Sequence, residues 1–271
     1  MNKMKSRLLF ATILLAPLAS AQDKGHECLI EPWQRIEIRS PVEALIANIP
    51  VDRGAAVKKG QLIVALDASI EEAALESARF RVKMQGQLDT AESRLNFARI
   101  KHKRRDELQQ QNFVSAQDKD EALAELRVAE AGMLEARENH QAAVLEVRKL
   151  EQQVRTRRLL SPFDGLVTER MQHPGELAQT GESARPILKL AQTSVLRVEV
   201  LLPASLYGSI KAGQKVDVEP QGPARGPYRA VVHVVDRVVD SASGTFGVRL
   251  SLPNPAGSIP AGIKCRVRFT P

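Results

Sequence analysis

The chain has 271 residues, a formal net charge of +7 at pH 7, 26% charged residues and 4% aromatic residues. The small charge excess does not by itself indicate a nucleic-acid-binding protein, and so few aromatic residues argue against one thick globular core. The abundance of Ala, Leu, Glu, Gln and Arg indicates instead a long helical portion.

The first 21 residues have the pattern of a cleavable secretory signal peptide. Three basic residues within positions 3–7 precede an apolar run over 8–18, and small residues lead to an expected cleavage after Ala21. The apolar run is shorter than the roughly 20 residues that a membrane-spanning helix needs. We therefore expect an exported, periplasmic protein; a retained membrane anchor is the alternative.

Two cysteines, Cys28 and Cys265, lie near opposite ends of the exported chain. In an oxidising compartment they can form one disulfide or remain two separate buried thiols, and the sequence alone leaves both open. A bridge would close almost the whole chain and, in the chain-entropy description, would stabilise it by about 4–5 kcal/mol. Two isolated cysteines are not the pattern of a metal site.

A short unit occurs twice at a constant offset of 121 residues: SPVEALIANIPVDRGAAVKKGQ from Ser40 and SPFDGLVTERMQHPGELAQTGE from Ser161. Both copies alternate strand-like segments with glycines, which suit turns that need a positive φ. The turn residues that the copies share are Pro41, Gly54, Gly60, Pro162, Gly175 and Gly181. About 28 residues of strand cannot form a core alone, so we expect the two copies to form one small β-sandwich.

Between the copies, the chain has no proline from Pro50 to Pro162, which favours uninterrupted helix. In the second half, residues at spacings of four and three form a coiled-coil seam. The seam positions are Ala122, Leu126, Ala129, Met133, Ala136, His140, Ala143, Val147, Leu150 and Val154. The same alternation is less clean in the first half, at Ile70, Ala74, Ser77, Arg81, Met84, Leu88, Ala91, Leu95, Ala98, His102 and Arg105.

These seams predict an antiparallel helical hairpin over 69–158, with two arms of about 43 residues each. Asn112, Phe113 and Val114 interrupt the pattern between the arms. Ser115 then caps the second helix, with Asp118 three residues later. The hairpin would split one β-domain into the halves 40–68 and 159–193.

This arrangement resembles the HlyD/AcrA family of periplasmic adaptors, or membrane fusion proteins. In that family two lipoyl-like half-motifs are split by a coiled-coil hairpin and followed by a β-barrel. The segment LRVEVLLPASLYGSIKAGQKVDVEP resembles the start of the barrel, and VDSASGTFGVRLSLPNPAGSIPAGIKCRVRF resembles its end. The implied fold class is α+β, with the barrel at 194–271; short strands with Gly and Pro turns indicate a small barrel independently.

The segment 22–39 is expected to add a strand to the barrel or to the lipoyl-like domain. Such a strand would bring Cys28 near Cys265, and we then expect a disulfide between them. Many members of the family also have a membrane-proximal domain and a membrane helix or lipid anchor, and this chain is expected to lack both.

Family members that dock a TolC-type channel have an arginine at the hairpin tip, a leucine four residues later and a serine seven residues after that. Arg104, Leu108 and Ser115 match this spacing. Arg104 and Leu108 share a helix face, and Ser115 starts the second arm beside them. The resemblance therefore implies that these residues dock an outer-membrane channel. The alternative is an ordinary exposed arginine, a seam leucine and a plain helix cap.

The function implied by the resemblance is that of a non-enzymatic adaptor for efflux or secretion. It would link an inner-membrane transporter of the RND or ABC type to a TolC-like outer-membrane channel, as a ring-like homo-oligomer of three or six copies. The sequence has no catalytic triad, zinc spacing or phosphate loop, so we expect no cofactor, metal or nucleic-acid partner. The alternatives are a periplasmic accessory protein that binds a ligand or metal, and a structural coiled-coil protein of the envelope without a transporter.

Overall fold

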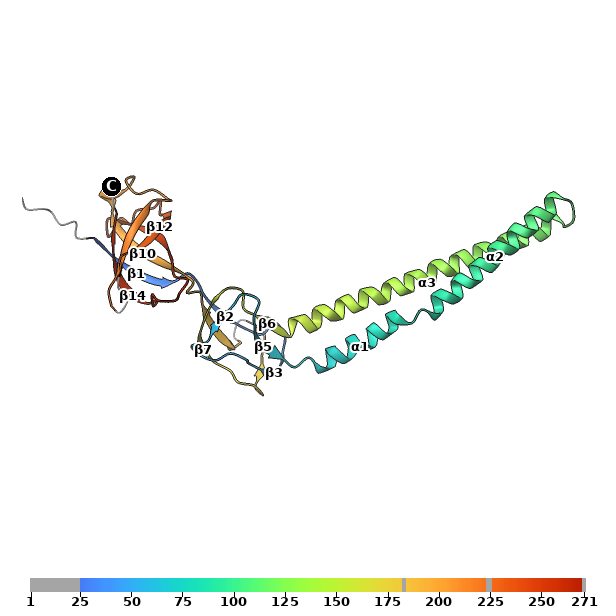
Figure 1. The fold of residues 1–271 in the computed structure, drawn as a ribbon, viewed down its shortest axis with the longest axis horizontal. Coiled ribbons are helices and arrows are strands. Elements are labelled where there is room, and N and C mark those ends of the chain that lie inside the picture. The colour runs from blue at the N-terminus through green and yellow to red at the C-terminus, as the bar shows by residue number, and fades with distance from the viewer. Residues whose placement is uncertain (1–24, 182–183, 223–225, 270–271) are drawn as a thin grey trace, which may run out of the picture. The chain divides into compact units, whose positions relative to one another are not determined.

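The computed structural model describes residues 25–181, 184–222 and 226–269, so the expected signal peptide lies outside the described residues (Figure 1). The chain divides into two compact units. One unit combines the residues up to Trp33 with those from Ser194 onward, and the other is Gln34–Thr193. A helical hairpin and a closed six-stranded barrel confirm the predicted α+β class.

The unit Gln34–Thr193 contains a β-sandwich to which both copies of the repeat contribute strands. Its strands are β2 (Arg35–Ile38), β3 (Ala44–Asn48), β4 (Ala56–Val57), β5 (Leu62–Leu66), β6 (Arg158–Leu160), β7 (Gly165–Arg170), β8 (Leu177–Ala178) and β9 (Leu188–Ala191). One sheet has the order β2-β9-β7-β4 and the other β6-β5-β3-β8. Each sheet therefore draws strands from both sides of the hairpin.

The two copies exchange equivalent hydrogen bonds. Strand β4 of the first copy pairs with β7, and β8 of the second copy pairs with β3. The Gly54 N–H donates to the Val167 carbonyl at 2.8 Å, and the Gly175 N–H donates to the Ile46 carbonyl, also at 2.8 Å. Both glycines have positive φ, at 85° and 89°, a conformation that disfavours any side chain. Neither half completes its hydrogen bonding without the other.

The Ser-Pro start of each copy also makes the same local contact. The Ser40 hydroxyl donates to the Val42 carbonyl, and the Ser161 hydroxyl donates to the Phe163 carbonyl at 2.7 Å. Both serines are buried. The other turn residues that the two copies share also lie in turns or bends: Pro41, Gly60, Pro162 and Gly181.

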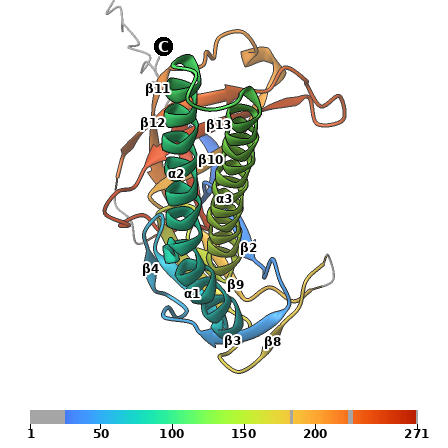
Figure 2. The same cartoon turned by 90° about the vertical axis from the view of Figure 1, so that its right-hand side faces the viewer.

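The hairpin consists of α1 (Ser69–Lys83), α2 (Gly86–Gln110) and α3 (Ala116–Thr156). Figure 2 shows α2 and α3 lying side by side. The two ends of the hairpin are tied together where they leave the sandwich. The Leu66 N–H donates to the Arg157 carbonyl at 2.8 Å, and the Arg157 guanidinium donates to the Asp67 carbonyl at 3.1 Å and pairs with Glu71. The insertion therefore begins and ends at one point of the β-domain.

The prediction of an unbroken first arm is wrong, because the helix stops at Met84, which is extended at φ −76° and ψ 98°. The predicted seam positions of α2 and α3 are all buried or half-buried. In α1, however, Ile70 is 81% exposed, and Leu75 and Ala78 are buried instead of the residues one position earlier. The apolar stripe thus shifts by one residue across the break. Gly86, a weak helix former, restarts the helix in the new register.

The second unit is a closed antiparallel barrel with the strand order β1-β10-β13-β12-β11-β14. Its strands are β1 (His26–Pro32), β10 (Val195–Pro203), β11 (Lys215–Pro220), β12 (Tyr228–Val235), β13 (Thr245–Pro253) and β14 (Ile263–Arg268), with a short 3-10 helix at Ala204–Leu206. Buried and exposed residues alternate along β10 and β13, as expected for strands with one face on a core. The inward residues include Phe246, Leu196 and Leu250, all fully buried.

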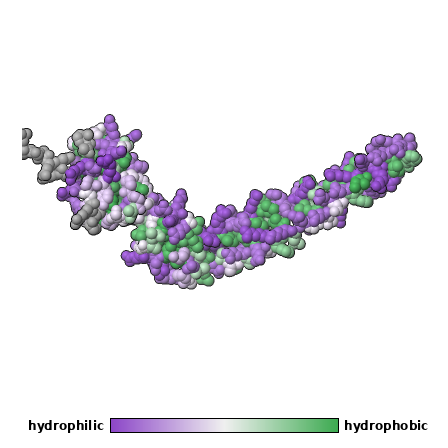
Figure 3. Space-filling model, viewed as in Figure 1, coloured by the Kyte–Doolittle hydropathy of each residue, from purple (hydrophilic) through white to green (hydrophobic). Residues whose placement is uncertain are grey.

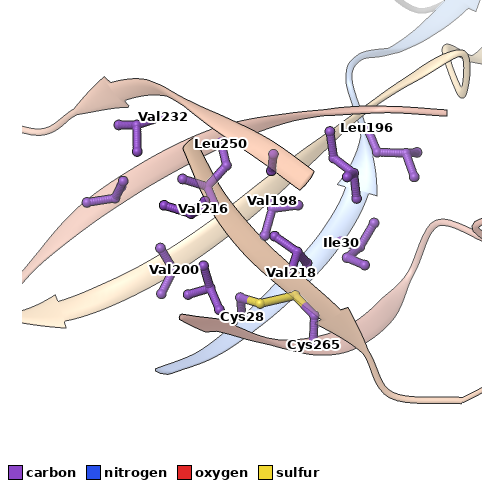
Figure 4. Close-up of a cluster of buried hydrophobic side chains, with 14 of the residues drawn as sticks. Cys28, Ile30, Leu196, Val198, Val200, Val216, Val218, Val232, Leu250 and Cys265 are labelled. Carbon is purple, nitrogen blue, oxygen red and sulfur yellow. A yellow bond between two sulfur atoms is a disulfide. The ribbon is translucent and has the colours of Figure 1, made fainter. Parts of the chain in front are cut away.

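Strand β1 closes the barrel, because it lies between β10 and β14. The next strand along the chain, β2, joins the sandwich, so the segment 22–39 gives one strand to each unit. Cys28 and Cys265 are direct partners in the register of β1 and β14, and they form a disulfide with a Cα–Cα distance of 4.8 Å. Figure 4 shows the disulfide among the buried Val and Leu side chains of the barrel.

Among the described residues, no helix combines the length and the apolar character needed to cross a bilayer.

We predict that the paired substitution Cys28→Ala and Cys265→Ala lowers the unfolding free energy of the barrel by up to about 5 kcal/mol, because the bridge closes a loop of almost the whole chain. The single tryptophan, Trp33, belongs to the barrel unit and stacks edge-on against His233 at 5.1 Å. Its fluorescence during chemical denaturation therefore reports the barrel. Helical circular dichroism, which reports mainly the hairpin, serves as the control. An unchanged Trp33 transition would contradict a stabilising bridge.

Candidate functional site

The hairpin tip is a tight reversal between α2 and α3. Asn112 has a positive φ of 61°, which asparagine tolerates better than most residues. The Asn112 N–H donates to the Gln109 carbonyl at 2.9 Å, and the Phe113 N–H donates to the Leu108 carbonyl at 2.9 Å. These bonds satisfy carbonyls at the end of α2 that have no partner within the helix. The apex therefore has a defined backbone shape.

Ser115 and Asp118 form a capping box at the start of α3. The Ser115 hydroxyl oxygen accepts from the Asp118 N–H at 3.2 Å. The Asp118 carboxylate accepts from the Ser115 hydroxyl at 2.6 Å and from the Ser115 N–H at 3.0 Å. The hydrogen bond from the Ser115 hydroxyl is the larger cause, and the one from the Ser115 N–H the smaller, of a pKa of Asp118 that lies below its usual value. The Ser115 hydroxyl is thus engaged within the tip itself.

Two ion pairs join α2 to α3 near the tip. Lys119 Nζ lies 2.6 Å from Asp106 Oδ1, and Lys101 Nζ lies 2.7 Å from Glu125 Oε2. The hydrogen bond from Lys119 lowers the pKa of Asp106, and the same contact raises the pKa of Lys119. Exposed pairs of this kind add little to the free energy of folding. They do show the register of the two helices, that is, which residues of α2 lie opposite which residues of α3.

The structure brings the three predicted docking residues to the tip. Arg104 is exposed, and among the residues described here its guanidinium has no ion-pair or hydrogen-bond partner. Leu108 lies one turn later and is half-buried, and Ser115 is the exposed cap residue. Arg104 is thus the member of the set that is free to bind another molecule.

Sequence reasoning did not assign a role to Phe113, which the structure places at the apex with 73% of its surface exposed. Its backbone N–H is fixed to Leu108, so the side chain is displayed by a defined turn. A large aromatic residue inside a polar segment, QQQNFVSAQ, is the sequence signal that could have identified it. Exposed aromatic side chains commonly act as anchors in protein interfaces.

The tip offers a cationic donor and apolar side chains rather than a reaction centre. Within the described parts of the chain, no group of three His, Cys, Asp or Glu side chains could hold a metal ion. Arg104 can donate several hydrogen bonds to carbonyl or carboxylate oxygens, and Phe113 can fill an apolar groove. This chemistry is that of a contact surface.

The sequence is similar to that of known proteins with a helical hairpin domain. Residues 81–148 match a family described as "RND MFP, alpha-helical hairpin domain". The chain is 25% identical to the macrolide export protein MacA of Escherichia coli O157:H7 over 267 residues, which covers 96% of this chain and 71% of MacA. It is 22% identical to the multidrug efflux pump subunit AcrA of Escherichia coli K12, over 86% of this chain and 58% of AcrA.

A solved structure shares the fold. The crystal structure of MacA from Actinobacillus actinomycetemcomitans superposes with a TM-score of 0.72 at 23% identity, and the match covers 90% of this chain and 76% of that one. The membrane fusion protein Spr0693 from Streptococcus pneumoniae R6 gives a TM-score of 0.60 at 14% identity, with 90% and 97% covered.

We predict that the Asp118 carboxyl group titrates below the usual range of an exposed aspartate, because Ser115 donates to its ionised form. A folded-state pKa below the unfolded one means that the cap stabilises α3 above the unfolded pKa. This stabilisation is lost as the pH falls through the folded-state pKa. Carbon-13 NMR of aspartate-labelled chain measures the midpoint.

The Ser115→Ala variant provides the control for this titration. It should return the Asp118 midpoint toward its ordinary value and leave Asp106 unchanged, because the pKa of Asp106 is lowered chiefly by Lys119. An Asp118 midpoint that is the same with and without the serine hydroxyl would rule out the capping box as its cause.

Proposed function

We propose that this chain, a member of the membrane fusion protein family, is a periplasmic adaptor subunit that links an inner-membrane transporter to a TolC-like outer-membrane channel. Relatives along most of its length are named as a macrolide export protein and as an efflux pump subunit. The observation that carries the proposal is the hairpin tip, where the Arg104 guanidinium has no partner within the described residues and the Phe113 side chain is 73% exposed. A long hairpin whose tip carries an unpaired guanidinium and an exposed aromatic side chain is suited to docking.

In this proposal the work of the protein is assembly, and the transporter supplies the energy. Arg104 donates hydrogen bonds to carbonyl or carboxylate oxygens of the channel, and Leu108 and Phe113 contact the groove between channel helices. Ser115 holds the start of α3 in place and contributes through shape, because its hydroxyl is already used in the capping box. No catalytic step is assigned to the chain.

The wider assembly follows from the same proposal. The chain acts in the periplasm after export by a cleavable signal peptide. Its partners are a transporter of the RND or ABC type, a TolC-like channel and other copies of itself, in a ring of three or six. The barrel faces the transporter, and the hairpins gather into a tube that reaches the channel. Efflux or secretion is the activity served.

We predict that Arg104→Asp lowers capture of a TolC-like channel by about tenfold or more per tip, since a hydrogen bond to a charged group contributes about 1.5–3 kcal/mol. Export that depends on the adaptor should be lost with it. Helical circular dichroism should stay unchanged, because the guanidinium supports no contact within the described residues. In-cell crosslinking to the channel measures the effect.

The matched control is Arg99→Asp, an equal charge change at an exposed position on a different face of α2. It should leave capture and export unaltered. Ser115→Thr preserves the cap and should also be tolerated. Ser115→Arg would change the docking surface and remove the helix cap at the same time, so its effect could not be assigned to either one. Normal capture and export in the Arg104→Asp variant would overturn the docking assignment.

A further inference from the structure

The disulfide between Cys28 and Cys265 is enclosed by the barrel that it closes. Cys28 is 6% exposed, Cys265 is 0% exposed, and both pack within the core of the barrel. Figure 3 shows mostly hydrophilic side chains on the visible face of the barrel unit, as expected where the apolar side chains point inward. A disulfide forms when one sulfur attacks another directly, so an oxidant has to reach a sulfur atom. In the closed barrel neither sulfur offers that access.

Strand β1 decides whether the barrel is closed. The other five strands are neighbours in the sheet and come from residues 195–268, whereas β1 comes from residues 26–32 and lies between β10 and β14. Without β1 these five strands form an open sheet with β10 and β14 at its two edges. Cys265 then lies on an edge strand, and Cys28 lies on an undocked segment. Both sulfurs are therefore accessible in the open state.

The bridge also fixes the register in which β1 docks. Cys28 and Cys265 are direct partners across β1 and β14, and Cys28 and Ile30 face the core. A shift of β1 by one residue would turn these side chains outward and place Glu27 and Leu29 inside. A bond between Cys28 and Cys265 excludes that shift. Docking of β1 and formation of the bond are thus two parts of one closing event.

The order of the chain determines which thiol is available first. The two cysteines are 237 residues apart, and Cys28 lies close to the end that leaves first during export. Cys28 therefore has no partner within the chain until nearly all of the chain has followed. Cys265 arrives last, between Lys264 and Arg266. Cations beside a thiol favour the thiolate, which is the attacking form.

We propose that the chain is a substrate of a periplasmic dithiol oxidase, that Cys28 is joined to this enzyme while β1 is undocked, and that Cys265 completes the bridge as β1 closes the barrel. The inference rests on the proposed export to the periplasm, an oxidising compartment. An oxidase of this class has a reactive disulfide of its own, which accepts two electrons. The closed barrel then shields the new bond from reductants.

The reaction has two exchange steps. In the first, the Cys28 thiolate attacks one sulfur of the oxidase disulfide, so that a mixed disulfide forms, the oxidase disulfide breaks and its second sulfur leaves as a thiolate. In the second, the Cys265 thiolate attacks the Cys28 sulfur, forms the Cys28–Cys265 bond and releases the first sulfur of the oxidase as a thiolate. The chain loses two electrons and its two thiol protons, and the oxidase takes up both as a dithiol.

The first test measures access to the bond in the purified full chain. Dithiothreitol is added without denaturant, and free thiols are counted by alkylation and mass spectrometry. We expect reduction to be slower than in the unfolded chain by on the order of a hundredfold or more, because the barrel has to open first. The same measurement in denaturant gives the rate for the unfolded chain. A folded chain that is reduced as fast as the unfolded chain would overturn the proposal.

The second test identifies the cysteine that binds the oxidase, in cells that export the full chain. In the Cys265→Ala variant the second step cannot occur, so a covalent complex between Cys28 and the oxidase should accumulate and should disappear on reduction. In the matched control, Cys28→Ala, the early thiol is missing and the complex should be several-fold weaker. Non-reducing gels and mass spectrometry of the linked peptides measure both.

Equal amounts of complex in the two variants would contradict the role of Cys28. No complex in either variant, while the wild-type chain carries the bridge, would contradict the role of the oxidase. A chain that is retained in the reducing cytosol with free thiols would contradict the export on which the inference rests. The Arg104 variant tests docking separately, so a failure of docking would leave the assignment of Cys28 unchanged.

Discussion

The structure depends on hydrogen bonds that two distant segments give to each other. Gly54 and Gly175 occupy equivalent places in the repeat, and each donates to the opposite copy at 2.8 Å. Neither half has enough strand to form a core alone, and both must be present before either sheet is complete. Everything between the halves is then forced to leave and return at one place, where Leu66 and Arg157 are bonded. Two antiparallel helices satisfy that constraint, because they begin and end next to each other.

The barrel also depends on pairing between segments far apart in the chain. Its strands come almost entirely from the end of the chain, yet β1 from the beginning closes the ring, and Cys28–Cys265 fixes that strand covalently. The sandwich and the barrel are each held together by pairing between distant segments. Neither kind of pairing uses the outward surface of the hairpin. Its exposed arginine and its apical phenylalanine are the contacts that we propose for another molecule.

Sequence patterns predicted the elements whose signals are local or periodic. The offset of 121 residues and the heptads of α3 specified a split β-domain and a hairpin, and the Ser-x-x-Asp pattern specified the cap at Ser115. The interleaving of the copies within each sheet could not be predicted, because strand order depends on pairing between segments far apart in the chain. The break at Met84 was also missed, since the alternation continued through it and only Gly86 signalled a weak point. Phe113 stands out in the sequence as an aromatic residue in a polar segment, but its exposure depends on the folded apex.

Native-state amide hydrogen exchange of Gly54 and Gly175 tests the central claim most directly. If the halves complete one another, both amides are protected and exchange with the same opening free energy and the same dependence on denaturant, because they open in one cooperative event. If one amide exchanges at the rate of a free peptide, or if the two open with clearly different free energies, then the halves fold separately and the account of the inserted hairpin is contradicted.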